Sequence, residues 1–185
     1  MRSGARGHLM AKDYPWYEIV EGDEPLLQGD FISECPIIVP PSELITGARE
    51  VNTRVVTYNV VVMSQSCDLV QGKLDLVLVC PIWPLNEFEK TSEYYKSKEG
   101  KEALRRGYIP GYHLLNKCDI KGFETDFLVV DFRNVYSVPF DFLKNLAKNR
   151  GKRVRLLPPY REHLSQAFAR FFMRVGLPVD IPSFK

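Results

Sequence analysis

The sequence predicts an α+β fold: a small, strongly bent β-sheet or barrel with an inserted helix and a C-terminal amphipathic helix. Two apolar runs rich in β-branched residues, 60–63 and 76–79, are too short for buried helices and predict core strands. Between 159 and 175, apolar residues recur at helical spacing. We interpret residues 1–13 as a flexible N-terminal extension and 14–185 as a single domain.

Two further segments, 36–41 and 127–136, are predicted to join these two core strands in one sheet. Residues 36–41 read PIIVPP, and flanking prolines are typical of an edge strand. Residues 53–63 form the strongest predicted strand, and 74–81 is its expected partner. Residues 127–136, FLVVDFRNVY, are predicted to be another strand of this sheet.

Helical signals come from three places. Residues 85–106 are strongly charged with aromatic residues at irregular helical spacing, which predicts an inserted helical segment broken or bent near Gly100. Residues 137–149 predict a turn and then a helix whose basic last turn suits the helix dipole. The final helix, 159–175, has one apolar face: Leu164, Ala167, Phe168, Phe171, Phe172 and Val175. A polar row on the same helix (Glu162, Gln166, Arg170, Arg174) either keeps it solvated or meets carboxylates of the body or of an acidic partner.

Composition narrows the class of protein. The chain has 185 residues, 45% of them hydrophobic, and no apolar run near the ~20 residues that span a bilayer, so no membrane segment is expected. The N-terminus lacks the apolar core of a secretory signal, which predicts a cytoplasmic protein. The four cysteines of the chain are far apart in the sequence, so we expect them to be reduced thiols.

Charge is distributed unevenly along the chain. Residues 144–174 contain nine lysines and arginines against one acidic residue, although the whole chain carries only +2. Such asymmetry indicates a polyanionic partner, either RNA or an acidic protein, unless the segment is simply a solvated surface. The candidate nucleic-acid-binding residues are Lys148, Arg150, Lys152, Arg153, Arg155 and Arg161.

The polar segment between the two core strands is the leading candidate site. It reads Ser64, Gln65, Ser66, Cys67, Asp68. These side chains either form turns that end the strand or make a ligand-binding loop. A third interpretation makes Cys67 a thiolate nucleophile with His113 or His163 as its base.

A metal site can be assembled from Cys35, Cys67, His113 and Cys118, and His113 and Cys118 have acceptable ligand spacing. Structural zinc usually has close ligand pairs on both sides, so separate thiols are the favoured interpretation. No metal and no cofactor is predicted.

Short motifs add a family resemblance. The segments Gly29-Asp30-Phe31, 58–63 and 76–81 resemble the MazF/PemK/Kid toxins over roughly residues 27–146, and 128–143 resembles the later strand and helix start of that family. The resemblance implies an SH3-like barrel and metal-independent endoribonuclease activity. Where the family has Arg-Pro, this chain has Tyr58-Asn59. Either Arg54 or Arg133 takes over the stabilisation of the phosphate charge, with Ser64 or Ser66 positioning the phosphate, or the barrel is kept without nuclease activity.

The resulting prediction is a nucleic-acid-interacting protein, endoribonuclease-like if it is an enzyme. The alternative is a non-catalytic interaction module of a toxin or defence system that docks onto an acidic protein partner. A cysteine hydrolase using Cys67 ranks below both, and the sequence leaves open whether the chain forms a homodimer.

Overall fold

A computed structural model describes residues 14–41, 45 and 52–173, so the predicted extension at 1–13 lies outside the described residues. The main sheet is antiparallel and has six strands in the order β2-β3-β4-β6-β5, with β7 pairing with β4. These strands are β2 (Phe31–Val39), β3 (Arg54–Val62), β4 (Leu76–Pro84), β5 (Tyr112–Leu115), β6 (Leu128–Asp131) and β7 (Tyr136–Pro139). A second sheet pairs β1 (Tyr17–Val20) with β8 (Arg153–Leu156). The α+β prediction is confirmed, and the main sheet is open rather than closed into a barrel.

The predicted pairing of the two apolar strands is confirmed. Val60 to Val62 of β3 lie opposite Val79 to Pro81 of β4. The predicted edge strand is also correct, because β2 pairs with β3 at one border of the sheet. A short helix, α1 (Ser66–Val70), connects β3 to β4.

The expected single strand at 127–136 is in fact two strands separated by a turn. The second half of β4 pairs with β6, and its first half pairs with β7. The turn is fixed by Asp131, whose carboxylate accepts hydrogen bonds from the Arg133 backbone N–H at 2.9 Å and from the Asn134 amide at 2.8 Å. Aspartate side chains commonly organise turns in this way.

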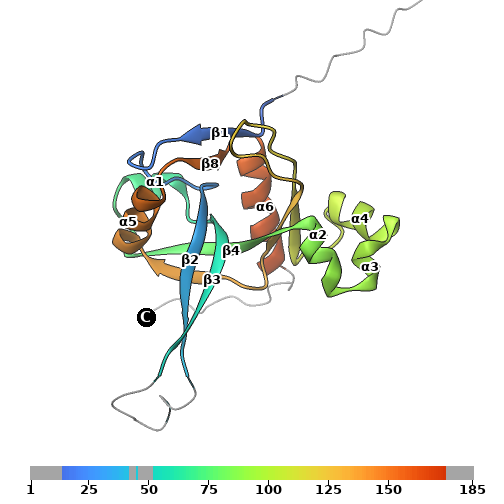
Figure 1. Ribbon diagram of the computed structural model, residues 1–185, viewed down its shortest axis with the longest axis horizontal. Helices are drawn as coiled ribbons and strands as arrows, with labels where there is room; N and C mark the ends of the chain where they lie inside the picture. Colours follow the sequence, from blue (N-terminus) through green and yellow to red (C-terminus); the bar gives the residue numbers. More distant parts are fainter. Residues whose placement is uncertain (1–13, 42–44, 46–51, 174–185) are drawn as a thin grey trace, which may run out of the picture.

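Strand alternation divides the core between the two faces of the sheet. On one face, Val60, Val62, Val77 and Val79 pack in a cluster with α5 (Phe140–Arg150). On the other face, Val61 and its neighbours pack in a cluster with α6 (Tyr160–Phe172) and the two-stranded sheet. Figure 1 shows α5 and α6 on either side of the strands.

The C-terminal helix therefore packs inward, and it begins and ends close to the predicted bounds. Leu164 is fully buried. Phe168 contacts Phe132 edge to face with ring centroids 5.4 Å apart, and the Phe171 ring is tilted against Phe132 at 6.3 Å. Phe172 is 60% exposed, so the predicted apolar face is wider than the buried one. Val175 lies outside the described residues. None of the described helices has the length and apolar character needed to cross a membrane.

The predicted helical insertion is present, at the side of the molecule in Figure 1. It consists of α2 (Leu85–Phe88), the 3-10 turn η2 (Glu89–Thr91), α3 (Glu93–Lys96) and α4 (Lys98–Arg105). The breaks fall at Ser92 and Ser97, whose hydroxyls cap α3 and α4, and the second break is close to the predicted position at Gly100. Gly100 is instead a close-packing position, since a Cβ there would lie 2.0 Å from the Tyr94 carbonyl oxygen.

A buried ion network joins β8 to the segment before β2. The Asp30 carboxylate is fully buried, and it accepts hydrogen bonds from Arg153 Nε at 2.8 Å and from Arg155 Nη2 at 3.0 Å. Both guanidinium groups also donate to backbone carbonyls between 21 and 25. The prediction that Arg153 and Arg155 bind nucleic acid is therefore wrong, because Asp30 holds both side chains inside the protein.

Candidate functional site

The four side chains predicted to cleave RNA are not brought together. Arg54 begins β3 and Ser64 follows its end, a separation on the order of 30 Å at the usual rise of a strand. The Arg133 guanidinium instead lies over the Tyr112 ring, 4.4 Å from its centroid, and forms an ion pair with Asp131.

The two predicted serines serve the fold. Ser64 is buried, and its hydroxyl accepts a hydrogen bond from the Leu78 backbone N–H at 2.9 Å. The Ser66 hydroxyl accepts one from the Gln28 backbone N–H at 3.1 Å. These bonds favour the strand-ending interpretation of the segment 64–68, whose Asp68 lies in the first turn of α1.

The rest of that segment meets α6. Gln65 donates a hydrogen bond from Nε2 to the Ser165 hydroxyl at 3.1 Å. Gln65, Ser66 and Cys67 line a polar hollow of about 370 Å³ with Gln28, Arg161, Glu162, Ser165 and Gln166. The Cys67 thiol is exposed, and neither His113 nor His163, the two predicted bases, lines this hollow.

The predicted basic surface is dispersed. Arg150 pairs with Glu34 at 3.0 Å, and Lys152 pairs with Glu21 at 2.8 Å. Arg161 pairs with its neighbour Glu162 and lines the hollow at Cys67, while Lys148 lies exposed on α5. With Arg153 and Arg155 buried, the six candidates do not form one phosphate-binding surface.

A different group of cationic side chains does converge, between α4, β5 and α6. We call this the cationic hollow; it has a volume of about 490 Å³. Its lining residues are Leu104, Arg105, Arg106, Gly107, Pro110, Tyr112, His113, Leu114, His163, Gln166, Ala167 and Arg170. They include three arginines and two histidines, and among the described residues no carboxylate lines the hollow.

Local structure places each histidine. On β5, Tyr112 and Leu114 pack toward the insertion, so strand alternation turns His113 toward the opposite face. There its ring stacks on Phe132 with centroids 6.2 Å apart, the same Phe132 that contacts α6. His163 lies in the first turn of α6, and the residues that follow at i+3, i+4 and i+7 supply the same wall of the hollow.

The electrostatics of the hollow favour an anionic ligand. Arg105 and Arg106 share one carboxylate, Glu102, through hydrogen bonds of 2.7 and 2.6 Å, and these bonds lower the Glu102 pKa to about 2. Because Glu102 carries one negative charge and the two arginines carry two positive charges, one positive charge is uncompensated. Arg170 donates to the neutral Gln166 side chain at 3.4 Å and adds a second.

The two histidines differ in their exposure to solvent. Burial, and to a smaller extent the charge of His163, lower the pKa of His113 to about 4. His113 is therefore neutral at pH 7 and can accept a proton. His163 is exposed at the mouth of the hollow.

Sequence reasoning recognised the two histidines as bases for Cys67, and His113 also as a metal ligand, but it missed Arg105 and Arg106. A usable signal was present: a histidine inside a short alternating strand, and a helix carrying His163, Gln166 and Arg170 on one side. No local pattern shows, however, that β5 and α6 lie next to each other in the fold.

The described residues contain no group of three or more histidine, cysteine, aspartate or glutamate side chains placed to hold a metal ion. Cys35, Cys80 and Cys118 are separate buried thiols. Comparison with known proteins gives no further identification, since no family model and no curated protein matches the chain.

Proposed function

We propose that the cationic hollow binds single-stranded RNA through its phosphates and that its two histidines cleave the bound strand without a metal ion. The single observation that carries the proposal is the convergence of His113 and His163 with three arginines in a hollow lined by no carboxylate. The proposal keeps the activity class that the MazF/PemK-like residues imply and moves its site from Arg54 and Ser64 to this hollow.

Binding follows from charge. Each arginine that contacts a phosphate releases a condensed counterion, so affinity falls as salt rises. Arg170 and the uncompensated charge of the pair at Arg105 and Arg106 supply such contacts. Arginine also fits phosphate geometry better than lysine, because its planar guanidinium donates two parallel hydrogen bonds.

Cleavage would use the ribose 2′-hydroxyl as the nucleophile. His113, neutral at pH 7, takes the 2′-hydroxyl proton as that oxygen attacks the adjacent phosphorus. The bond from phosphorus to the 5′-oxygen breaks, and that oxygen receives a proton from His163, which acts as the general acid. The products are a 2′,3′-cyclic phosphate and a 5′-hydroxyl, with the arginines stabilising the charge on the phosphate oxygens.

The low pKa of His113 has a consequence for this step. An imidazole with a pKa near 4 is a weak base, but a bound phosphate favours its protonated form and raises that pKa. Substrate binding would therefore bring His113 closer to the working pH, which is where a general base is most effective.

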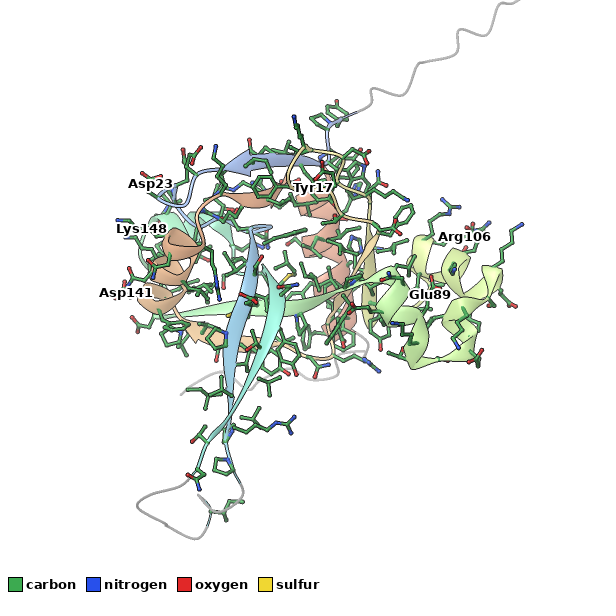
Figure 2. The ribbon with its side chains drawn as sticks, viewed as in Figure 1. Tyr17, Asp23, Glu89, Arg106, Asp141 and Lys148 are labelled. Carbon is green, nitrogen blue, oxygen red and sulfur yellow. The ribbon has the colours of Figure 1, made fainter. Side chains whose placement is uncertain are left out.

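The test is incubation of the protein with a mixed-sequence RNA and with DNA of the same sequence, both in chelator. We expect RNA cleavage leaving cyclic phosphate ends, no DNA cleavage, and loss of at least about a hundredfold in rate in His113→Gln and His163→Gln. Lys148→Gln is the matched control, because Lys148 lies on α5 at the other side of the molecule from Arg106 (Figure 2). The catalytic proposal is contradicted if the wild-type protein leaves RNA intact, or if both histidine variants cleave RNA as fast as the wild-type protein does.

A non-catalytic module that binds an acidic protein remains the second candidate. It is favoured by exposed apolar side chains on the projecting β2–β3 arm (Figure 1), where Ile38 is 66% and Val55 57% exposed. In that case Arg105, Arg106 and Arg170 would pair with carboxylates of the partner. This function would be favoured if the protein binds no RNA at low salt but binds a protein partner, and if that binding depends on Arg170.

A further inference from the structure

An uncharged groove lies between two borders of the curved main sheet. Its volume is about 550 Å³. Residues 36–38 of β2 and Val55 of β3 line one side, and residues 135–139 with Phe142 of α5 line the other. None of these described residues is charged, and none of them lines the cationic hollow. We call it the edge groove.

The outer border of β7 offers unpaired backbone groups to this groove. The Phe140 N–H, directly after β7, donates to the Asp75 carbonyl at 2.9 Å. Because alternate residues of a strand direct their backbone groups to opposite borders, the even-numbered residues of β7 pair with β4. Ser137 therefore directs its N–H and C=O outward, where the described residues place no further strand beside β7. Ser137 is exposed, so an added strand can reach these groups.

The opposite border of the groove is the free edge of β2. The Val62 N–H of β3 donates to the Asp30 carbonyl at 2.9 Å, so Val55, seven residues earlier, directs its backbone groups away from β2 and toward β4. Ile38 lies opposite Val55, and its own N–H and C=O therefore point outward. The other outward residue in the lining, Pro36, has no N–H. The β7 border is thus the better partner for an added strand.

The chemistry of the groove specifies its occupant. A free strand edge beside an apolar groove is a template for an extended segment, whose backbone bonds to the edge while every second side chain enters the groove. Because no lining residue is charged, the side chains that enter have to be uncharged as well. Phe142, which is 44% exposed, leaves apolar surface for them to cover.

The sequence that follows α6 has this pattern. Residues 174–185 read RVGLPVDIPSFK, with apolar side chains at 175, 177, 179 and 181. In a strand these four side chains would share one face, and their N–H groups would all point to one border. Asp180 falls on the opposite face. Pro178 and Pro182 remove two donors from the opposite border, which is typical of a strand that pairs on one side only.

The end of α6 lies close to one end of the groove. A Cβ on Gly111 would lie 3.7 Å from Phe171 Cε2 and 3.2 Å from Arg133 Cγ, so the last turn of α6 is next to Arg133. Arg133 precedes the lining residue Val135 by two positions. Residues 174–181 would span about 25 Å when extended, and the four residues of β7 span about 13 Å. The segment is therefore long enough to follow β7 along the groove.

We propose that residues 175–181 dock into the edge groove as an added strand beside β7. The apolar side chains at the four odd-numbered positions enter the groove, the backbone bonds to Ser137, and Asp180 faces solvent. A strand of a partner protein can then use this groove only by displacing residues 175–181. The proposal does not depend on RNA binding at the cationic hollow.

The test uses the full chain and a fluorescently labelled peptide of residues 174–185, with binding followed by anisotropy. In wild type the chain's own segment competes at a high effective concentration, so Val179→Asp in the chain is expected to increase peptide affinity at least about tenfold. The peptide that itself carries Val179→Asp is expected not to bind. Adding Ser137→Pro to the Val179→Asp chain removes the edge N–H and is expected to weaken peptide binding about three- to tenfold.

Stability and a matched control complete the test. Val179→Asp exposes apolar surface that the docked segment covers, so its melting temperature is expected to be at least about 3 °C lower than that of wild type. Ser183→Asp adds the same charge beyond the alternating run and is expected to change neither the melting temperature nor peptide binding.

Four results would overturn the proposal. They are no peptide binding by any chain, equal peptide binding by wild type and Val179→Asp, peptide binding that Ser137→Pro leaves unchanged, and equal melting temperatures of wild type and Val179→Asp. A concentration-dependent molar mass of wild type in sedimentation, lost in Val179→Asp, would also overturn it, because the segment would then occupy a second copy of the chain.

Discussion

Replacing Asp30 by asparagine tests the buried network that holds β8 in place. The carboxylate accepts hydrogen bonds from both guanidinium groups and from the Leu27 backbone N–H at 3.1 Å. Asparagine has nearly the same volume but no charge, so Arg153 would remain buried with only carbonyl oxygens as partners. Arg155 would keep, besides carbonyl oxygens, only the partly exposed Glu18 carboxylate at 4.0 Å. Breaking a buried ion pair on one side typically costs about 3–5 kcal/mol.

For a chain of this size, that loss corresponds to a melting temperature about 6–20 °C lower. The assay is thermal and urea unfolding followed by circular dichroism, with the urea m-value compared between variants. The control is Glu93→Gln, which removes an exposed ion pair with Lys96 and is expected to cost less than about 1 kcal/mol. An Asp30→Asn protein within about 1 kcal/mol of wild type would refute the reasoning, because the network would then add nothing to stability.

Three further predictions concern stability and thiol chemistry. The His113 pKa is about 4 in the folded protein and about 6.5 in the unfolded chain, so the unfolded chain binds more protons between these values. Stability is therefore expected to fall as the pH drops from 7 to 4, by up to about 3 kcal/mol from this group, and less steeply in His113→Gln. Gly100→Ala places a Cβ against the Tyr94 carbonyl and is expected to cost about 1–3 kcal/mol in urea unfolding, whereas Glu99→Ala costs little. In native protein, a disulfide reagent is expected to titrate Cys67 alone and the other three cysteines only after unfolding.

Each of these has a clear contrary result. An identical pH slope in wild type and His113→Gln would show that this imidazole is not buried neutral. An alanine at position 100 as stable as wild type would mean that α3 and α4 do not pack as described. Rapid reaction of more than one native thiol would contradict the burial of Cys35, Cys80 or Cys118.

Sequence patterns predicted correctly those helices and strands that are determined by residues close together in the chain. The strands β3 and β4 follow from their β-branched runs, and α6 follows from its apolar spacing. The turn at Asp131 was also readable, since aspartate and asparagine there are turn residues, but the apolar residues on both sides outweighed them in the prediction.

Elements stabilised by distant partners were missed. β8 reads RVRL, and its two arginines resemble a solvated surface until Asp30, more than 120 residues earlier, neutralises them inside the core. The cationic hollow has the same origin. His113 and His163 are 50 residues apart, and they meet only because β5 pairs with β6 and α6 packs on Phe132.

The most direct test of RNA binding at the cationic hollow is the salt dependence of affinity. Fluorescence anisotropy with a labelled single-stranded RNA, measured from about 50 to 200 mM salt, would compare wild type, Arg170→Gln and Lys148→Gln. If Arg170 contacts a phosphate, its replacement weakens binding and reduces the slope of log affinity against log salt by about 0.7, while Lys148→Gln matches wild type. Equal slopes in all three proteins, or equal losses in both variants, would contradict binding at this hollow.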